Sequence, residues 1–299
     1  MNNKIAETIE QAVKSLNSCE SDCRNYPSRA EIIGLIDKLR LILFFDFFEE
    51  NFSLTLPAGE RLRTLLWQLS SNLVTQIALA YPYNPKVNNH TDKEILALAQ
   101  GITANFMAAI PQIKEELATD IEAAFNGDPA AESRVEIILA YPGLYATMVY
   151  RIANRFYNLG VPLIPRIMAE YAHSLTAIDI HPAATIGRHF FIDHGSGTVI
   201  GATAHIGNHV KIYQGVTLGA LSTKEGQKLK NIKRHPTIKD NATIYAGATI
   251  LGGETVIGEN AVIGGNAFIA KSVPNNTVVR VRNPELQYKG DGATAWSNF

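Results

Sequence analysis

The chain has 299 residues, 46% of them hydrophobic, and a formal net charge of −1. This length and composition suffice for a sizeable core in one or two domains, and the near-neutral charge provides no field to bind nucleic acid or an anionic membrane. The N-terminus lacks the basic-then-apolar order of a secretion signal, and the longest apolar run, LILFFDFF, is short and contains Asp46. We therefore expect a cytoplasmic protein with neither nucleic acid nor a membrane as its partner.

Cys19 and Cys23 are the only cysteines. No histidine lies near them in the sequence, so a structural zinc site lacks ligands, and two cysteines do not make a disulfide framework. We expect both to be free thiols in a reducing compartment.

Up to about residue 175, apolar residues recur at the spacing of amphipathic helices. Two runs show this pattern, and the second closes at Gly160 and Pro162, residue types that end helices. We interpret both stripes as core or subunit contacts. The first contains Leu62, Leu65, Leu66, Leu69, Leu73 and Ile77, and the second contains Leu144, Met148, Ile152 and Phe156.

From Ile180 onward the period of the aliphatic residues changes to six. No helix or alternating strand produces this period, whereas a coil of three short faces does, because one aliphatic residue of each face points inward and stacks on the next coil. Each buried Ile or Leu contributes roughly 1.5–3 kcal/mol of transfer free energy, so the stack holds the coils together. The sequence therefore predicts a triangular parallel β-solenoid, anchored by Ile180, Ile186, Ile192, Ile200, Ile206, Ile212, Leu218, Ile238, Ile244, Ile250, Ile257, Ile263 and Ile269.

A polar segment, STKEGQKLKNIKRHP, interrupts the repeat. Twenty residues, two more than three hexads, separate Leu218 from Ile238 there, and their composition cannot line a solenoid interior. We expect an excursion loop, the kind of segment in which functional residues collect on a rigid scaffold. The spacing of seven between Ile250 and Ile257 predicts a bulged turn.

The stretch IDHGSG breaks the hexad that begins at Ile192, because Asp193 and His194 replace the usual glycine and filler. Asp179 lies fifteen residues before His194, close to one turn of eighteen, and stacked coils lie about 4.8 Å apart, so the two side chains can meet near one corner. A carboxylate against one imidazole nitrogen leaves the other nitrogen as a base. We predict a general-base dyad; the alternative is a structural histidine.

The sequence KRHP at the end of the loop brings Arg234 and His235 together. Arginine suits the bidentate grip of a carboxylate, and a neighbouring histidine can orient a substrate or stabilise charge. The lysines of the loop can rim a phosphate site or face water, and we favour water for all four: Lys224, Lys228, Lys230 and Lys233.

Five motifs, AIDIHPAATIG, DHGSGTVIG, VTLG, RHP and ATILGG, together resemble the serine O-acetyltransferases of the hexapeptide-repeat acyltransferase superfamily. The likeness covers about residues 126 to 273, and this combination of motifs is specific, whereas hexads alone would indicate only the superfamily. It implies an α+β fold in which a left-handed parallel β-helix with catalytic residues (176–275) follows a helical assembly and substrate-side domain (1–175) and precedes a tail (276–299).

The resemblance also implies a reaction. His194 would take the hydroxyl proton of L-serine as the oxygen attacks the thioester of acetyl-CoA, and Asp179 would orient the imidazole. The transfer would be direct, without an acyl-enzyme, and would give O-acetylserine for cysteine biosynthesis.

For the acceptor, the resemblance implies a clamp with opposite charges at its two ends. Asp128 and Asp193 would hold the serine ammonium, while Arg234 and His235 would hold its carboxylate. A zwitterion needs such a pair with the base between the two ends, so the implied assignment is physically consistent.

By the same resemblance, acetyl-CoA lies in the groove between neighbouring solenoids of a trimer, and no metal is expected. Small residues permit a close approach of the backbone there, and two basic residues can meet the phosphates. The family assembles through its helices as a dimer of trimers, which implies a hexamer. The groove would be lined by Gly219, Ala246, Gly264, Gly265, Lys271 and Arg280.

The chain departs from the family's pattern in three places. Ala202 stands where the family's GETA segment has Glu, which leaves the identity of the acceptor open. The loop reads GALSTKEGQKLKNIK instead of the glycine-rich GGTGK, so a lid over the site can close differently. The chain ends in WSNF, whereas many relatives end in an Ile that inserts into the next enzyme of cysteine synthesis. A complex with O-acetylserine sulfhydrylase and feedback inhibition by cysteine therefore stay open.

Three rival interpretations remain. The first keeps the fold and the base but changes the acceptor, to homoserine or a sugar hydroxyl, or the donor, to another acyl-CoA. The second is a zinc lyase resembling the carbonic anhydrases built on this solenoid, since six of the eight histidines lie in this half, although His189, His205 and His209 show no repeat-matched ligand spacing. The third is a non-catalytic trimeric scaffold.

Overall fold

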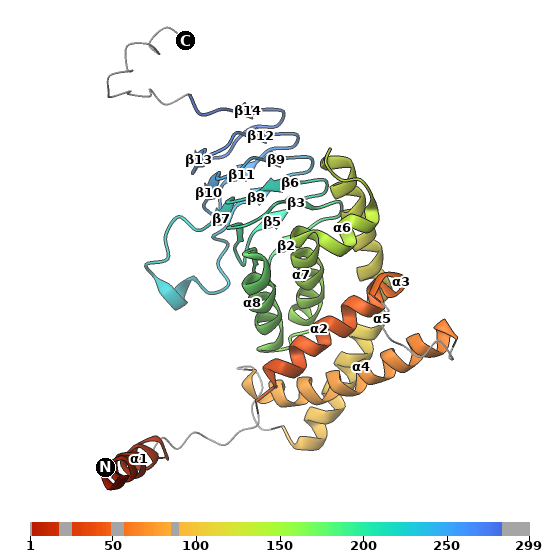
Figure 1. The fold of residues 1–299 in the computed structure, drawn as a ribbon. Coiled ribbons are helices and arrows are strands. Elements are labelled where there is room, and N and C mark those ends of the chain that lie inside the picture. Colours follow the sequence, from red (N-terminus) through yellow and green to blue (C-terminus); the bar gives the residue numbers. More distant parts are fainter. Residues whose placement is uncertain (1, 18–25, 49–56, 85–89, 283–299) are drawn as a thin grey trace.

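The computed structural model describes residues 2–17, 26–48, 57–84 and 90–282, which form a helical part and a solenoid (Figure 1). Cys19, Cys23 and the WSNF terminus lie outside these residues. The helices precede every strand, which confirms the predicted α+β order. They are α1 (Asn2–Asn17), α2 (Arg29–Leu43), α3 (Phe45–Phe48), α4 (Ala58–Ala80), α5 (Asp92–Gly127), α6 (Arg134–Ala140), α7 (Pro142–Asn158) and α8 (Ile164–Thr176), with a 3-10 turn at Tyr81–Tyr83.

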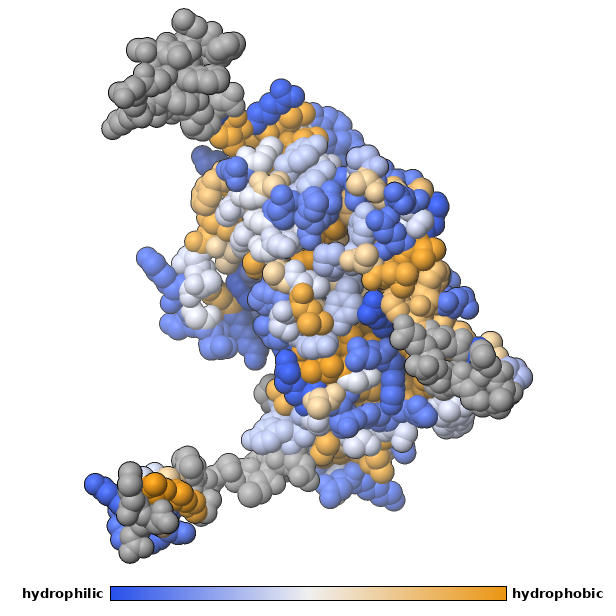
Figure 2. Space-filling view, in the orientation of Figure 1, coloured by the Kyte–Doolittle hydropathy of each residue, from blue (hydrophilic) through white to orange (hydrophobic). Residues whose placement is uncertain are grey.

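The apolar stripes read from the sequence form the core of the helical part. Leu65 to Ile77 in α4 and Leu144 to Phe156 in α7 are buried at helical spacing, and α7 ends at Asn158, just before the predicted stop. α2 packs against α4 and α8, and α4 packs against α5, so the stripes face one another. By contrast, α1 exposes its apolar side chains (Figure 2): Ile5, Ile9 and Val13.

Among the described helices, α5 is the one long and apolar enough to cross a membrane by length and composition. It packs against α4, α7 and β3 (Phe191–Asp193). Its buried Asp120 accepts hydrogen bonds from Arg151 of α7 at 2.6 and 2.8 Å. These are the contacts of a core helix in a folded domain.

The solenoid has three faces, and each face is a parallel sheet whose strands stack along the axis of the solenoid (Figure 1). Sheet A has the order β1-β4-β7-β10-β13, sheet B β2-β5-β8-β11 and sheet C β3-β6-β9-β12-β14, so the chain visits A, B and C in turn. The strands are β1 (Asp179–Ile180), β2 (Thr185–Ile186), β3, β4 (Val199–Ile200), β5 (His205–Ile206), β6 (Lys211–Tyr213), β7 (Thr217–Gly219), β8 (Thr237–Ile238), β9 (Thr243–Ile244), β10 (Thr249–Leu251), β11 (Val256–Ile257), β12 (Val262–Ile263), β13 (Phe268–Ile269) and β14 (Val278–Val279).

The strand register stacks one predicted anchor on the next. Ile180 pairs with Ile200, Ile200 with Leu218, and Leu218 with Ile250. Twelve of the thirteen anchors are buried, and Ile269 in the last coil is partly buried. The hexad pattern therefore predicts the solenoid interior correctly.

The excursion loop takes the chain from one face of the solenoid only to the next, although its length is close to three hexads. β7 in sheet A leads to β8 in sheet B, so the chain between Leu218 and Ile238 makes one step between faces rather than three. An ordinary step takes six residues, and the twenty present here leave fourteen for the excursion. A 3-10 turn at Gly226–Leu229 lies within the loop. At the other end of the solenoid, β14 continues sheet C beyond residue 275.

The corners of the coils are called A–B, B–C and C–A after the sheets that they join. Every B–C corner contains one non-glycine residue with a left-handed backbone, at φ between 54° and 59°, a conformation that Asn and His adopt more readily than most residues. This repeat places two imidazoles on neighbouring coils, where they stack with their centroids 4.1 Å apart. The five corner residues are His189, His209, Asn241, Asn260 and Asn276.

Candidate active site

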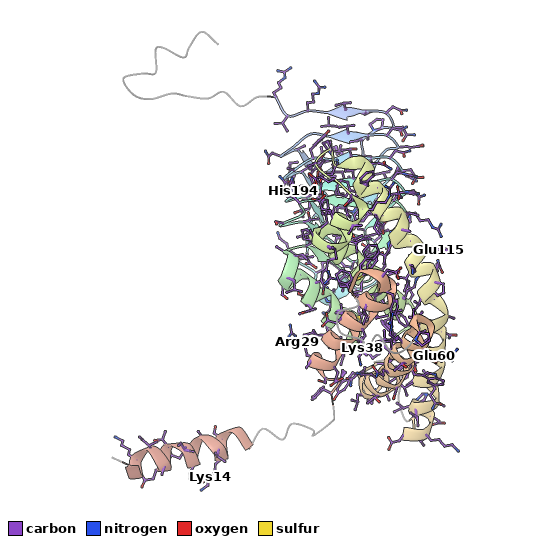
Figure 3. All side chains as sticks on the ribbon, turned by 45° about the vertical axis from the view of Figure 1, so that its right-hand side comes forward. Lys14, Arg29, Lys38, Glu60, Glu115 and His194 are labelled. Atoms are coloured by element: carbon purple, nitrogen blue, oxygen red, sulfur yellow. The ribbon has the colours of Figure 1, made fainter. Side chains whose placement is uncertain are left out.

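His194 lies at the C–A corner of the first coil, where eight residues instead of six separate successive anchors. His194 has φ 56°, and Gly195 and Gly197 follow with φ 86° and 78°. A Cβ on Gly195 would lie 2.5 Å from Cδ1 of Ile178, so this position requires glycine. The enlarged corner projects an imidazole that is 73% exposed, at the margin of the solenoid and far from Glu60 of the helical part (Figure 3).

Asp193 stands between two groups that can carry positive charge. Its Oδ1 lies 3.9 Å from Nε2 of His194, and its Oδ2 lies 3.9 Å from Nζ of Lys211. Its side chain is only 12% exposed, because it occupies the last position of β3 beneath the corner. The acid and the base of the DH pair are therefore neighbours in space as well as in sequence.

Asp128 reaches the same corner from the helical part, directly after the end of α5. Its Oδ2 accepts a hydrogen bond from the Tyr141 hydroxyl at 2.6 Å, and its Oδ1 accepts one from the backbone N–H of Ala130 at 2.8 Å. These two bonds hold the pKa of Asp128 below its usual value, and the charges of Lys211 and His194 add to the effect. Asp128 is therefore an ionised carboxylate fixed beside the corner.

Asp179 is not paired with the imidazole that the sequence predicts it to orient. No hydrogen bond or ion pair joins it to His194 within the described part of the chain, and its carboxylate instead lies within 4.8 Å of ligand atoms of Glu170 and His173 in α8. Asp179 starts β1, three residues after the end of α8, whereas His194 lies at the C–A corner that closes the same coil. The spacing of Glu170, His173 and Asp179 would suit a metal ion, but Arg166 forms an ion pair with Glu170 there.

Arg234 and His235 lie at an A–B corner, where the loop rejoins the solenoid. Nδ1 of His235 accepts a hydrogen bond from the backbone N–H of Thr203 at 3.0 Å, so the neutral ring carries its proton on Nε2. Oγ1 of Thr203 accepts the N–H groups of Arg234 and His235 at 2.9 and 3.1 Å. Burial lowers the pKa of His235 to about 4, and the charges of Arg234 and Lys233 act in the same direction.

A cavity of about 470 Å³ opens beside this cluster, between the loop, the first coils and α7. Tyr157, Ala202, Lys233 and Arg234 are among its lining residues. His181 lines it as well, and its pKa is lowered to about 4, first by burial and then by nearby positive charges that include Arg234. A cavity with several positive charges and neutral imidazoles suits an anionic group such as a carboxylate.

The two halves of the predicted acceptor clamp lie at different corners. Asp128, Asp193 and His194 gather at the C–A corner, whereas Arg234 and His235 lie at the A–B corner, with the width of sheet A between them. One solenoid therefore does not bring together the residues predicted to bind an ammonium and those predicted to bind a carboxylate.

The residues predicted to line a coenzyme groove divide in the same way. At the C–A corner, a Cβ on Gly265 would lie 3.1 Å from the carbonyl oxygen of Ala246, and one on Gly264 would lie 3.5 Å from Cα of Arg280, so these backbones pack closely. The C–A group contains Ala246, Gly264, Gly265 and Arg280, and the A–B group contains Gly219 and Lys271.

Sequence reasoning missed several residues that contact the predicted ones, namely Tyr141, His181, Thr203 and Lys211. The repeat itself could have indicated Lys211, because the register pairs it with Phe191 one coil away, next to Asp193. No spacing in the sequence connects Tyr141 with Asp128, because Asp128 follows α5 and Tyr141 lies between α6 and α7, and only the packing of these helices brings the two residues together.

Comparisons with known proteins agree with this architecture, although no family model matches the chain. Over 143 residues it is 52% identical to a plasmid serine acetyltransferase of Synechococcus elongatus, a match that covers 47% of this chain and 45% of that protein. The chain thus spans about half the length of curated relatives such as this one. Serine acetyltransferase 1 of Entamoeba histolytica, solved in complex with L-cysteine, aligns with a TM-score of 0.72 and 39% identity over 82% of this chain and 86% of that one.

The serine acetyltransferase of Neisseria gonorrhoeae, solved in complex with serine, aligns with a TM-score of 0.55 and 25% identity over 84% of this chain and 97% of that one. The likeness to these structures extends through the helical part as well as the solenoid, because it covers more of the chain than the hexads do. On the sequence identity with the Entamoeba protein and the coverage of both chains, this chain belongs to the serine acetyltransferase family of hexapeptide-repeat proteins.

Proposed function

We propose that this protein transfers the acetyl group of acetyl-CoA to the hydroxyl of L-serine, giving O-acetylserine for cysteine biosynthesis in the cytoplasm. The observation that carries the proposal is the C–A corner, where His194 projects from a left-handed turn beside the carboxylates of Asp193 and Asp128. This corner combines a base with groups that can bind an ammonium. Membership in a family whose named members act on serine supports the same acceptor.

His194 is the general base of the proposed reaction. A ring nitrogen takes the hydroxyl proton as the serine oxygen attacks the carbonyl carbon of the thioester; the C–S bond then breaks, and the imidazolium returns the proton to the departing thiolate of CoA. The exposure of the imidazole leaves it accessible to both substrates, and Asp193 stabilises the imidazolium. The family likeness implies that Asp179 orients the imidazole, and we keep this role in the proposal. Asp193 is the alternative residue for the role, and variants of both residues test it.

The acceptor clamp is proposed to form between two copies of the chain. Asp128 and Asp193 of one copy hold the ammonium, and Arg234 and His235 of the next copy hold the carboxylate. A cyclic homotrimer around an axis along the solenoids brings a C–A corner of one copy beside an A–B corner of its neighbour. A dimer of such trimers, joined through the helical parts, is the assembly that the family likeness implies.

Acetyl-CoA is proposed to lie in the same groove between copies. Ala246, Gly264 and Gly265 have small side chains or none, so the coenzyme can approach their backbones closely beside Arg280, whose guanidinium can bind a phosphate. Gly219 and Lys271 would line the opposite wall from the neighbouring copy. Both basic residues are exposed, as this role requires: Lys271 and Arg280.

Ala202 favours a second candidate, the same transfer to a longer hydroxyl amino acid such as homoserine. It lines the cavity of about 470 Å³ next to Arg234 and brings no acidic side chain to it. The added room would accept one more methylene while the base, the donor and the charged clamp stay the same.

Thiol release from acetyl-CoA, measured with a panel of hydroxyl acceptors led by L-serine, tests the proposal. We expect serine-dependent release, and in His194→Ala a kcat lower by roughly 10²–10⁴-fold with the KM for acetyl-CoA nearly unchanged. His90→Ala is the matched control, since His90 is exposed and lies before α5, and it should keep the wild-type rate.

Four results would change the proposal. Release that survives in His194→Ala rejects the base. Release with another acceptor but not with serine moves the substrate and points to Ala202, and no release with any acceptor rejects the function. An unchanged kcat in Asp179→Asn, together with a reduced kcat in Asp193→Asn, reassigns the orienting role to Asp193.

A further inference from the structure

Lys211 joins the end of the longest helix to the solenoid. It begins β6, where the register pairs it with Phe191 of β3, and its side chain is 21% exposed. Its Nζ donates a hydrogen bond to the carbonyl of Gly127, the last residue of α5. Among the hydrogen bonds of the described residues, this is the one that connects the last residue of α5 with the solenoid.

Four partners hold the ammonium of Lys211 in place. The Gly127 carbonyl belongs to the C-terminus of a helix, where the backbone dipole favours a positive charge. Nζ lies 5.0 Å from the ring centroid of Phe191 and 4.8 Å from that of Tyr213, which are cation–π distances, and 3.9 Å from Oδ2 of Asp193. A lysine that merely faced water would not require this many contacts to order its long side chain.

Two partners of Lys211 determine where the two carboxylates of the C–A corner lie: Gly127 is the neighbour of Asp128, and Asp193 is itself a partner. Gly127 precedes Asp128 and packs closely against Phe191, because a Cβ on Gly127 would lie 2.9 Å from Cδ1 of that ring. Asp193 ends the strand that Phe191 begins. We propose that Lys211 is a positioning residue that sets the separation of Asp128 and Asp193 and thereby builds the ammonium end of the acceptor site. This inference rests on the function proposed above.

The charges of the corner fit this role. Two carboxylates and one lysine leave a single negative charge, which matches one substrate ammonium. Without the lysine, Asp128 and Asp193 would repel each other, and no hydrogen bond would hold the end of α5 on the solenoid. Lys211 also repels the incoming ammonium, but its Nζ is already directed to the Gly127 carbonyl and the two rings. Positioning and repulsion predict opposite changes in acceptor affinity, so kinetics distinguish them.

The kinetic test compares Lys211→Met with Lys211→Arg and with Lys239→Met, a control at an exposed lysine of the same solenoid. In Lys211→Met we expect the KM for serine to rise at least about tenfold, kcat to change less than about threefold, and the KM for acetyl-CoA to stay the same. Lys211→Arg should recover most of the loss, since it keeps the charge.

Hydrogen–deuterium exchange of the substrate-free protein provides a readout that needs no acceptor. The amides of Asp128 and Ala130 are hydrogen-bonded to the Ala124 carbonyl and to Oδ1 of Asp128. They should exchange faster in Lys211→Met and at the wild-type rate in Lys239→Met. If no acceptor supports thiol release, the proposed function fails while exchange still reports whether Lys211 docks the end of α5. An unchanged serine KM, a lower serine KM or unchanged exchange in Lys211→Met overturns the role of Lys211.

Discussion

At the scale of single residues, backbone conformation separates corner histidines from the proposed base. His189 and His209 occupy B–C corners, where other coils use asparagine for the same left-handed turn, so their stacking follows from the repeat. His194 has the same φ but stands in the enlarged C–A corner, where the left-handed glycines of the next two coils, Gly215 and Gly247, stack above Gly197 and not above His194. A side chain held in this energetically costly left-handed conformation, at a position that the other coils do not repeat, is typical of a functional residue.

The contact between Gly201 and His235 leads to a prediction at this scale. In Gly201→Ala the new Cβ would lie 2.0 Å from Cδ2 of the His235 ring, so the ring must move and its hydrogen bond from Thr203 is lost. We expect the free energy of unfolding to fall by about 1–3 kcal/mol, as in other overpacked sites, and the KM for the acceptor to rise.

Urea unfolding and acceptor kinetics of Gly201→Ala test this prediction. The matched control is Gly101→Ala in α5, where no atom lies within 4 Å of the added Cβ, and alanine favours the helix by about 0.5–1 kcal/mol. A Gly201→Ala protein as stable and active as the control would contradict the predicted crowding.

At the scale of elements, a buried charge network fixes α5, α7 and the solenoid to one another. Arg151 of α7 donates to both carboxylate oxygens of Asp120 in α5 and, at 2.8 Å, to the carbonyl of Gly187. Asp120 also accepts the backbone N–H of Phe190 at 2.9 Å. Because Asp128 directly follows Gly127, the last residue of α5, this network orients the helix that places a carboxylate at the C–A corner.

Arg151→Met should destabilise the protein strongly. Asp120 has a side chain only 1% exposed, and burial already raises its pKa against the opposing effect of Arg151, so removal of the arginine leaves an uncompensated buried carboxyl. We expect a loss of about 3–5 kcal/mol in the free energy of unfolding, measured by urea denaturation. The double variant Asp120→Leu/Arg151→Met should recover much of it.

Arg63→Met is the matched control for this network. Arg63 pairs with Glu60 on the surface of α4, with both side chains more than half exposed, and its loss should cost less than about 1 kcal/mol. A loss in Arg151→Met no larger than in this control would contradict the structural role of the network.

At the scale of the whole molecule, buried neutral histidines couple stability to pH. Burial lowers the pKa of His181 and of His235 from 6.5 to about 4, and it shifts His189 in the same direction. The unfolded chain therefore binds more protons than the folded chain between these values. Stability should be highest above pH 6.5 and should fall as the pH drops towards 4.

Thermal unfolding across this pH range measures the effect. His181→Gln and His235→Gln should each flatten the acid side of the stability curve, since glutamine does not titrate, while His90→Gln, at an exposed position, should leave it unchanged. A wild-type midpoint that stays constant from pH 7 to pH 4.5 would contradict the prediction.

Much of this architecture can be predicted from the sequence because a solenoid is locally encoded. Each anchor stacks on a residue about one coil away, so the period alone predicts the buried positions. The excursion loop was harder to place. Its length could be counted, but which sheet the chain rejoins at Ile238 depends on strand pairing, and the structure shows one step where the count suggested three hexads.

The sequence by itself determined the order of helices and coils, the anchors, and the enlarged corner with its DH pair, because these depend on residues close in the chain. Only the tertiary structure decided that Asp179 lies beside α8, that Tyr141 and Lys211 hold the region of Asp128 and Asp193, and that the two halves of the clamp stand at different corners. These relations arise where α5, α7 and α8 pack on the solenoid. The packing of whole elements sets such distances, and no sequence period records them.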